Sequence, residues 1–147
     1  MSARYVGVVG PGEASASEAA VAEEVGGLLA EGGAVVVCGG LGGVMEAACR
    51  GAKSKLGLTV GLLPGLDRSA ANGWVDVAVA TGLGELRNGL IVRASDALVA
   101  VGGGAGTLSE IAFALKVGRP VIGIGTYELD GVVQAASAAE AATLALR

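Results

Sequence analysis

The fold is decided by Asp96–Glu110, the stretch that reads DALVAVGGGAGTLSE. Residues Asp96–Val101 form a strand-length apolar run, and a glycine-rich turn follows from Gly102. The residues beyond this turn have the pattern of a helix. A buried strand, a glycine turn and a helix in this order are typical of an α/β domain built on a parallel sheet.

Other strand-like runs extend this pattern along the chain: Tyr5–Val9, Ala34–Cys38, Leu58–Leu63, Val75–Ala80 and Pro120–Ile124. Helical stretches fill most of the intervals between them. Because strands that alternate with helices require right-handed crossovers, the sequence predicts an α/β, Rossmann-like three-layer domain. We expect a mostly parallel sheet of six or seven strands flanked by helices.

Capping signals mark the start of two helices. The segment Ser15–Glu18 has the spacing of a capping box, so the first helix is expected to begin there and to end before Gly32–Gly33. The segment Ser137–Glu140 repeats this signal before an alanine-rich stretch at the C-terminus. A short apolar stretch, Val132–Val133, precedes this last helix.

The length and composition favour one domain, and we expect a single Rossmann-like domain over residues 1–147. Hydrophobic residues make up 52% of the chain and aromatic residues only 3%, so the core must consist mainly of Val, Leu, Ile and Ala. The mean hydropathy is +0.66, but the apolar runs are short and broken by glycine. We therefore expect no membrane-spanning segment.

The absence of histidine excludes several kinds of site. A Ser-His-Asp triad, a Cys-His pair and a His-based zinc site are all impossible, and we expect no metal site. The net charge of −4 and the lack of a Lys/Arg run argue against nucleic acid as a partner. The expected partner is therefore a small molecule.

The two cysteines, Cys38 and Cys49, form neither a disulfide framework nor a Cys-x-x-Cys motif. They are interpreted as small buried residues of a protein from a reducing compartment. The chain runs from Met1 into a strand pattern without a hydrophobic stretch typical of a signal peptide. We therefore expect the protein in the cytoplasm.

Two glycine clusters follow predicted strands and open predicted helices. The first is Cys38–Glu46, CGGLGGVME, and the second is Val101–Glu110. Successive backbone N–H groups in such turns form an anion cradle that the helix dipole strengthens. For either cluster alone, the alternative to phosphate binding is that its glycines only allow a tight turn. Two clusters at the carboxyl edge of one parallel sheet favour phosphate binding.

Neither cluster has the pattern of a common nucleotide-binding motif. No Gly-Lys-Ser/Thr follows, which excludes a P-loop, and the first strand lacks G-x-G-x-x-G. The second strand ends in Cys38 and Gly39, where an NAD site needs an acidic residue for the ribose.

Glu110 and Arg87 are the candidate charged groups. Glu110 either completes a capping box with Thr107 or projects from the first helical turn as a general acid or base. Arg87 is either a surface residue or a clamp for phosphate or carboxylate.

The loop from position 64 to 73 is long enough to act as a lid. Trp74 beside it either stacks on a ligand or anchors the loop. The polar residues of this loop are Asp67, Arg68 and Asn72.

These motifs together resemble one superfamily over nearly the whole chain. It is the Rossmann-like superfamily of the molybdenum cofactor carrier proteins and the "Lonely guy" phosphoribohydrolases, which are also called lysine decarboxylase-like (LOG-like) proteins. The carrier branch is the more similar. The segments that carry the resemblance are VGVVGPG at Val6–Gly12, CGGLGGVMEAA at Cys38–Ala48, GLLPG at Gly61–Gly65, Arg87–Asn88 and GGGAGTLSE at Gly102–Glu110.

This resemblance implies binding of a phosphorylated pterin, the molybdenum cofactor, or of a nucleotide. For the carrier branch it implies a phosphate on the amide cradle and a pterin near the loop after the third strand. In the phosphoribohydrolases, an arginine and the glutamate ending Pro-Gly-Gly-x-Gly-Thr-x-x-Glu release the base from a nucleoside 5′-monophosphate. Arg87 and Glu110 occupy the matching positions, but Gly102 replaces the proline and Asn88 replaces a basic residue.

Three functions therefore remain open. The first is a carrier that binds the molybdenum cofactor or a nucleotide, and the second is a cytokinin-activating type of nucleoside 5′-monophosphate phosphoribohydrolase. The third is a scaffold whose glycine turns are only structural. No cofactor is expected to be needed for folding. The expected ligand-binding residues are Gly10, Gly39, Gly40, Gly42, Gly43, Met45, Arg87, Asn88, Gly102, Gly103, Gly104, Gly106, Thr107 and Glu110, of which Arg87 and Glu110 are catalytic only in a hydrolase.

The sequence also predicts a homo-oligomer. The segment Ile111–Leu115 is apolar on more than one helical face, and such a helix needs burial. The resemblance implies a dimer or tetramer assembled through helices.

Overall fold

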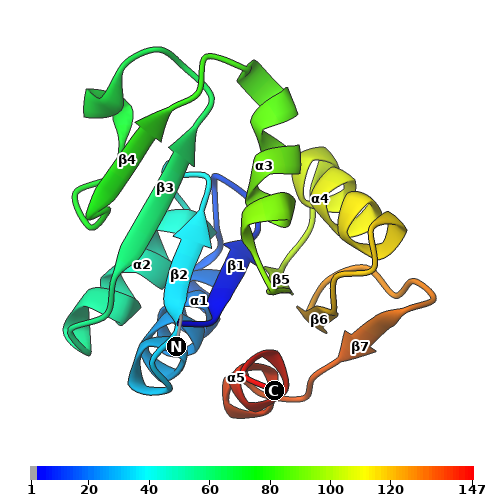
Figure 1. Cartoon of the computed structure of the whole chain (residues 1–147). Helices are drawn as coiled ribbons and strands as arrows, with labels where there is room; N and C mark the ends of the chain where they lie inside the picture. The colour runs from blue at the N-terminus through cyan, green and yellow to red at the C-terminus, as the bar shows by residue number, and fades with distance from the viewer. Residues whose placement is uncertain (1–2) are drawn as a thin grey trace.

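The protein is built around a seven-stranded sheet in which each strand runs parallel to its neighbours (Figure 1). The structure, a computed structural model, describes residues 3–147. Across the sheet the strand order is β4-β3-β2-β1-β5-β6-β7. The strands are β1 (Tyr5–Val9), β2 (Val35–Cys38), β3 (Thr59–Leu63), β4 (Val77–Ala80), β5 (Ala97–Val101), β6 (Val121–Ile124) and β7 (Val132–Gln134).

Helices cover both faces of this sheet and complete the predicted three-layer α/β fold (Figure 1). Helices α1, α2 and α5 pack on one face, and α3 and α4 pack on the other. Within residues 3–147, no helix combines the length and apolar character that a bilayer crossing requires. The helices are α1 (Ala16–Glu31), α2 (Val44–Ser54), α3 (Arg87–Ala94), α4 (Ala105–Lys116) and α5 (Ala138–Ala145), with short 3-10 turns at Arg68–Ala70 and Gly84–Leu86.

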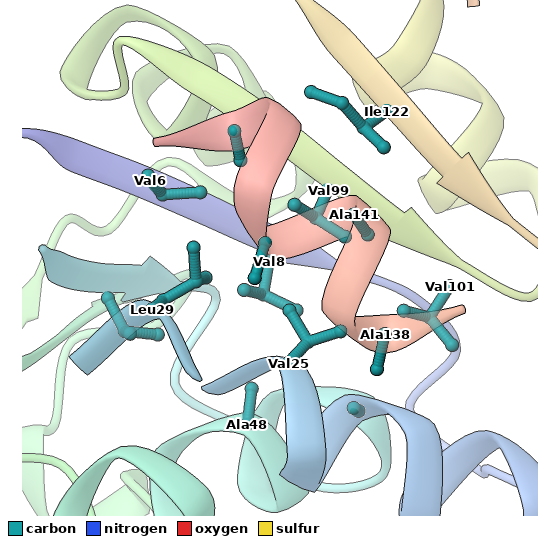
Figure 2. Close-up of a cluster of buried hydrophobic side chains, with 14 of the residues drawn as sticks. Val6, Val8, Val25, Leu29, Ala48, Val99, Val101, Ile122, Ala138 and Ala141 are labelled. Atoms are coloured by element: carbon teal, nitrogen blue, oxygen red, sulfur yellow. The ribbon is translucent and has the colours of Figure 1, made fainter. Parts of the chain in front are cut away.

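Strand β5 shows how the apolar runs of the sequence are used. All five of its residues are buried, with Val99 facing α1 and α5 and Leu98 facing α3 and α4. Figure 2 shows the first of these clusters, in which Val25 of α1 and Ala141 of α5 meet Val8 of β1. Within residues 3–147 the buried apolar side chains are aliphatic or sulfur-containing and none is aromatic, as the composition predicts.

Helices α1 and α2 approach each other backbone to backbone through two glycines. A Cβ atom on Gly26 would overlap the carbonyl oxygen of Ala48, and one on Gly51 would overlap the carbonyl oxygen of Glu23. Only glycine allows so close an approach, because it has no side chain. This contact fixes α2, whose N-terminal end points at the carboxyl edge of the sheet.

The structure confirms the predicted capping box at Ser15 completely and the one at Ser137 in part. It also contains one strand that was not predicted. Ser15 accepts a hydrogen bond from the N–H of Glu18, whose carboxylate accepts from Ser15 N–H. Ser137 caps α5 by accepting from the N–H of Glu140, but the Glu140 carboxylate accepts from the N–H of Ala136 and not from that of Ser137. The stretch at positions 132–134 is strand β7, which pairs with β6. Three residues are too few to show strand periodicity in a sequence.

The order of the strands reverses next to β1. The chain runs outward from β1 through β2 and β3 to β4, then returns to place β5 on the other side of β1. The loops that follow β1 and β5 therefore leave the sheet toward opposite faces. In an open parallel sheet, this switch point at the carboxyl edge is where a ligand crevice forms.

Candidate functional site

A cleft of about 400 Å³ lies at this switch point. Its walls come from the loops after β1, β2 and β5, from the start of α3 and from the first turns of α4. Such a volume lies within the range of small-molecule pockets, which is roughly 300–1,000 Å³. The lining residues are Val8, Val9, Gly10, Pro11, Gly12, Gly39, Leu41, Met45, Pro64, Glu85, Arg87, Asn88, Gly103, Gly104, Gly106, Thr107 and Glu110.

Most residues of the predicted site lie together in this cleft, but four do not. The predicted residues in its lining are Gly10, Gly39, Met45, Arg87, Asn88, Gly103, Gly104, Gly106, Thr107 and Glu110. The predicted residues outside the lining are Gly40, Gly42, Gly43 and Gly102.

The first glycine cluster mainly packs one loop against another. Gly43 has a φ of +64°, and a Cβ atom there would overlap the carbonyl oxygen of Pro11. Gly40 has a φ of +80°, and its Cβ position lies 2.8 Å from Cδ2 of Leu63. These two glycines therefore allow a tight, closely packed turn and do not line the cleft.

The second cluster presents backbone donors to the cleft. Helix α4 has Gly104 as its N-cap, with a φ of +113° and no side-chain cap. The first helical hydrogen bond runs 2.9 Å from Leu108 N–H to the Gly104 carbonyl. The N–H groups of Ala105, Gly106 and Thr107 therefore precede the helical ladder and need another acceptor. Gly106 and Thr107 line the cleft, where an anion can supply one.

Gly104 itself contributes less to this cradle than the sequence predicts. Its N–H donates to the hydroxyl oxygen of Tyr127 over 3.0 Å. Tyr127 is therefore part of the support of the turn, a role for which its sequence position gave no signal.

Glu110 projects into the cleft from the second turn of α4, and only 6% of its surface is exposed. The capping-box interpretation is wrong, because the helix begins at Ala105 and Thr107 lies inside it. Burial raises the pKa of Glu110 to about 8, against the opposing effect of the Arg87 charge. At neutral pH most Glu110 side chains are therefore protonated and can donate a hydrogen bond.

Arg87 is the first residue of α3, and it is buried rather than on the surface. Its Nε donates to the Leu62 carbonyl over 2.8 Å, and one Nη donates to the Gly39 carbonyl over 3.4 Å. Its other Nη donates to the side-chain oxygen of Asn88. Among the described residues 3–147, no ion pair within 4.0 Å joins it to Glu110. Arg87 thus ties the ends of β2 and β3 together beside the cleft.

Asn88 connects the start of α3 to the second glycine turn. Its Nδ2 lies 3.3 Å from Oγ of Ser109, and that hydroxyl donates to the Gly106 carbonyl over 2.7 Å. A lysine or arginine here would lack the acceptor that Arg87 uses. Asn88 therefore accepts a hydrogen bond from Arg87 and donates one to Ser109.

The loop between β3 and β4 is tied down through Asn72. The Asn72 N–H donates to the Gly40 carbonyl over 2.9 Å, and its side-chain amide donates to the Leu41 carbonyl over 2.8 Å. Trp74 N–H donates to the Asn72 side chain over 3.0 Å, and Trp74 is not among the described residues that line the cleft. The Trp74 side chain is 43% exposed, so the structure favours neither stacking in the cleft nor anchoring by the indole, and the loop is held through Asn72 and the Trp74 backbone.

Sequence reasoning missed several lining residues. Pro11 and Gly12 belong to the loop after β1, and of the motif at positions 6–12 only Gly10 was predicted as a site residue. Glu85 enters from the 3-10 turn before α3, and no sequence signal marked it. Within residues 3–147, no group of three or more Cys, Asp or Glu side chains is placed to hold a metal ion.

Comparison with known proteins identifies the family. The sequence model of the SLOG cluster4 family matches residues 3–146. The chain belongs to the SLOG cluster4 family. This membership confirms the resemblance read from the motifs.

Several proteins are similar to this SLOG cluster4 chain over most of their length. An uncharacterised protein from Archaeoglobus fulgidus is 50% identical over 121 residues, which cover 82% of this chain and 80% of that protein. The structure of a molybdenum cofactor binding protein from the phototrophic bacterium Rippkaea orientalis matches with a TM-score of 0.92 and 39% identity, covering 98% of this chain and 96% of that one. The molybdenum cofactor carrier protein of Chlamydomonas reinhardtii matches with a TM-score of 0.89 and 36% identity, covering 97% and 96%.

Proposed function

We propose that the cleft binds a phosphorylated pterin, such as the molybdenum cofactor, or a nucleotide, and that the protein carries this ligand unchanged. The observation that carries the proposal is the pairing, in one cleft, of the N–H groups at the start of α4 with the buried carboxyl group of Glu110. The similar proteins from Rippkaea and Chlamydomonas, whose titles name the molybdenum cofactor, support it.

Of the charged side chains in the cleft lining, Arg87 and the mostly neutral Glu110 favour an anionic ligand at neutral pH, whereas the Glu85 carboxylate opposes one. Arg87 is positive, and Glu110, with a pKa of about 8, is mostly neutral. A protonated carboxyl group does not repel a phosphate and can donate a hydrogen bond to one of its oxygens. The dipole of α4 adds positive potential at the same end.

We assign the two parts of the ligand to two regions of the cleft. The phosphate is assigned to the N–H groups of Gly106 and Thr107. The pterin or base is assigned to the apolar wall of Leu41, Met45 and Pro64, which includes the loop after β3. The molybdenum cofactor is cargo in this proposal, so the protein needs to enclose it and not to react with it.

A methyl group in the cradle tests the proposal. Gly106 does not have a positive φ, and its Cβ position lies 3.8 Å from the Asn88 side chain, so Gly106→Ala is compatible with the fold. Because Gly106 and Asn88 both line the cleft, we expect the added methyl group to weaken binding of a phosphorylated ligand about tenfold or more. Gly89→Ala in α3 is the matched control, because its Cβ lies 3.6 Å from Phe113 and outside the cleft.

Isothermal titration calorimetry with GMP, AMP and isolated molybdenum cofactor measures this effect. Guanosine and adenosine, which lack the phosphate, should bind much more weakly than their monophosphates. Equal affinity for nucleosides and nucleotides, or equal binding by Gly106→Ala and wild type, contradicts the assignment of the phosphate. No binding of any phosphorylated compound would favour the scaffold hypothesis.

A phosphoribohydrolase is the second candidate, and the protonated Glu110 beside Arg87 is the observation that favours it. A carboxyl group with a pKa of about 8 can act as a general acid toward a departing base. The Arg87 guanidinium, however, already donates to two backbone carbonyls and to Asn88. This leaves it fewer donors for a ribose phosphate.

The turn after β5 also differs from the hydrolase motif in backbone geometry. Gly102 has a φ of +75°, whereas proline is fixed near −65°. Its N–H donates to the Ile124 carbonyl over 3.3 Å, and a Cβ atom there would overlap the Glu18 carboxylate. The motif's proline therefore does not fit this turn.

Chromatographic detection of free base distinguishes the two candidates. The protein is incubated with nucleoside 5′-monophosphates, including isopentenyl-adenosine monophosphate. Base release that disappears in Glu110→Gln identifies a hydrolase and contradicts the carrier proposal. Binding without release from any of these compounds supports the carrier proposal.

A further inference from the structure

Two thiols that the proposed function does not use lie directly behind the cleft. Cys38 ends β2, Cys49 lies on α2, and both are fully buried. Their Sγ atoms are 3.4 Å apart, within hydrogen-bonding distance. Met45, which lines the cleft, packs in the same small cluster.

The two thiols have different surroundings. Cys38 Sγ accepts the N–H of Gly40 over 3.3 Å. The hydrogen bond from Cys49 lowers the pKa of Cys38, with smaller contributions in the same direction from Gly40 N–H and the Arg87 charge, while burial opposes them. The same hydrogen bond and burial raise the pKa of Cys49. Cys38 is thus the better nucleophile, and Cys49 is placed to resolve an oxidised Cys38.

We propose that Cys38 and Cys49 are an oxidative modification site, at which a peroxide forms an internal disulfide that alters the ligand cleft. In the first step the Cys38 thiolate attacks hydrogen peroxide, the O–O bond breaks, and a sulfenic acid and hydroxide form. In the second step the Cys49 sulfur attacks the Cys38 sulfur, the S–O bond breaks, and the leaving hydroxide takes the Cys49 thiol proton to form water. The hydroxide from the first step takes the proton that the Cys38 thiol has lost. Overall, two thiols and one peroxide give one disulfide and two waters.

The two sulfur atoms already lie 3.4 Å apart, so a disulfide between them requires only a short approach. A disulfide is about 2.05 Å long, so the two sulfurs must approach by roughly 1.3 Å. Because Cys38 Sγ accepts the N–H of Gly40, a movement of this sulfur changes a hydrogen bond of the turn after β2. Met45 belongs both to the cleft lining and to the cluster around the two thiols, so we expect a peroxide, which is little larger than water, to reach the pair from the cleft.

The link to the cleft runs through the turn after β2. Gly39 follows Cys38, lines the cleft and accepts a hydrogen bond from Arg87. A Cβ atom on Gly39 would lie 2.6 Å from the Arg87 guanidinium, so the turn and Arg87 are in close contact. A shift of this turn must therefore move Arg87 and the wall that it supports. This part of the inference rests on the proposed function, whereas disulfide formation does not.

Mass spectrometry tests the modification. The reduced protein is treated with hydrogen peroxide, quenched, denatured, alkylated and cut at Glu46, which lies between the two cysteines. We expect two linked peptides that together are about 2 Da lighter, no alkylation, and separation by dithiothreitol. Cys49→Ala should instead leave Cys38 as a sulfenic acid that dimedone traps. Alkylation of both cysteines after treatment, or disulfides only between chains, overturns the proposal.

A titration with GMP tests the effect on the cleft. We expect the disulfide form to bind GMP at least about fivefold more weakly than the reduced form, with recovery after dithiothreitol. Oxidation with diamide, which reacts with thiols and not with methionine, excludes an effect of Met45 sulfoxide. Equal affinities overturn the coupling to the cleft. If the reduced protein does not bind GMP, AMP or molybdenum cofactor, the proposed function fails, and the peptide masses still decide the disulfide.

Discussion

Replacing Glu110 by glutamine should change how the stability of the protein depends on pH. Glutamine has nearly the same shape as protonated glutamate but cannot ionise. In the wild type, the ordinary pKa of 4.5 applies to the unfolded chain, and burial raises the pKa to about 8 in the fold. The folded state therefore binds a proton that the unfolded state has lost over this whole interval.

The sign follows from that difference. The contribution of Glu110 to stability is complete below pH 4.5, falls as the pH rises, and is lost once the pH exceeds about 8. Each pH unit between the two pKa values corresponds to about 1.4 kcal/mol. The wild type should thus lose up to roughly 5 kcal/mol relative to Glu110→Gln between these pH values. Such a loss is a large part of the roughly 5–15 kcal/mol that stabilises a typical domain.

Urea denaturation of both proteins from about pH 5 to about pH 9 measures this effect. The difference between their unfolding free energies isolates Glu110, because the other titrating groups are common to both chains. We expect this difference to grow in favour of Glu110→Gln as the pH rises, with a plateau above the pKa of about 8. Ligand binding by the wild type should also weaken there, because an ionised Glu110 repels phosphate.

Two results would refute this reasoning. A free-energy difference that is constant with pH would mean that Glu110 titrates alike in the folded and unfolded chains. A difference that shifts in favour of the wild type with rising pH would mean a lowered pKa and a dominant attraction to Arg87. Titration of the Glu110 carboxyl carbon by NMR provides an independent check.

Three further predictions concern the scaffold. Gly26→Ala should destabilise the protein by about 2 kcal/mol or more despite the better helix propensity of alanine, because its Cβ overlaps the Ala48 carbonyl. In the same urea assay the control Gly27→Ala should be tolerated, because the nearest atom to its Cβ is 3.4 Å away. Ser15→Ala should cost about 1 kcal/mol of unfolding free energy through loss of the cap on α1. Sedimentation velocity should show a dimer or tetramer, and a concentration-independent monomer would contradict the predicted oligomer.

The layered fold could be predicted because several strands have a clear sequence pattern. Runs such as Val35–Cys38 and Ala97–Val101 are apolar throughout, as strands buried on both faces must be, and glycine marks where each one ends. Strand β7 could not be predicted, because Val132–Gln134 is short, partly exposed and held mainly by pairing with β6. Such pairing depends on residues distant in the chain.

Only the parts of the candidate site that belong to local sequence motifs could be predicted. The motifs located the turn around Gly106 and the side chains of Arg87 and Glu110, which do share a cleft. They could not distinguish a glycine that faces a cleft from one, such as Gly43, that lets two loops touch. Nor could they show that Arg87 is buried, because its hydrogen-bond acceptors lie at the ends of other strands.

The backbone at Gly102 also bears on how the two branches of this superfamily can be interconverted. Proline at this position requires a different turn, a new place for the Glu18 carboxylate and another partner for the Ile124 carbonyl. We therefore expect Gly102→Pro alone to destabilise the turn. An evolutionary path from one branch to the other must change the turn and its neighbours together, and an engineer who wants hydrolase activity should graft the whole loop.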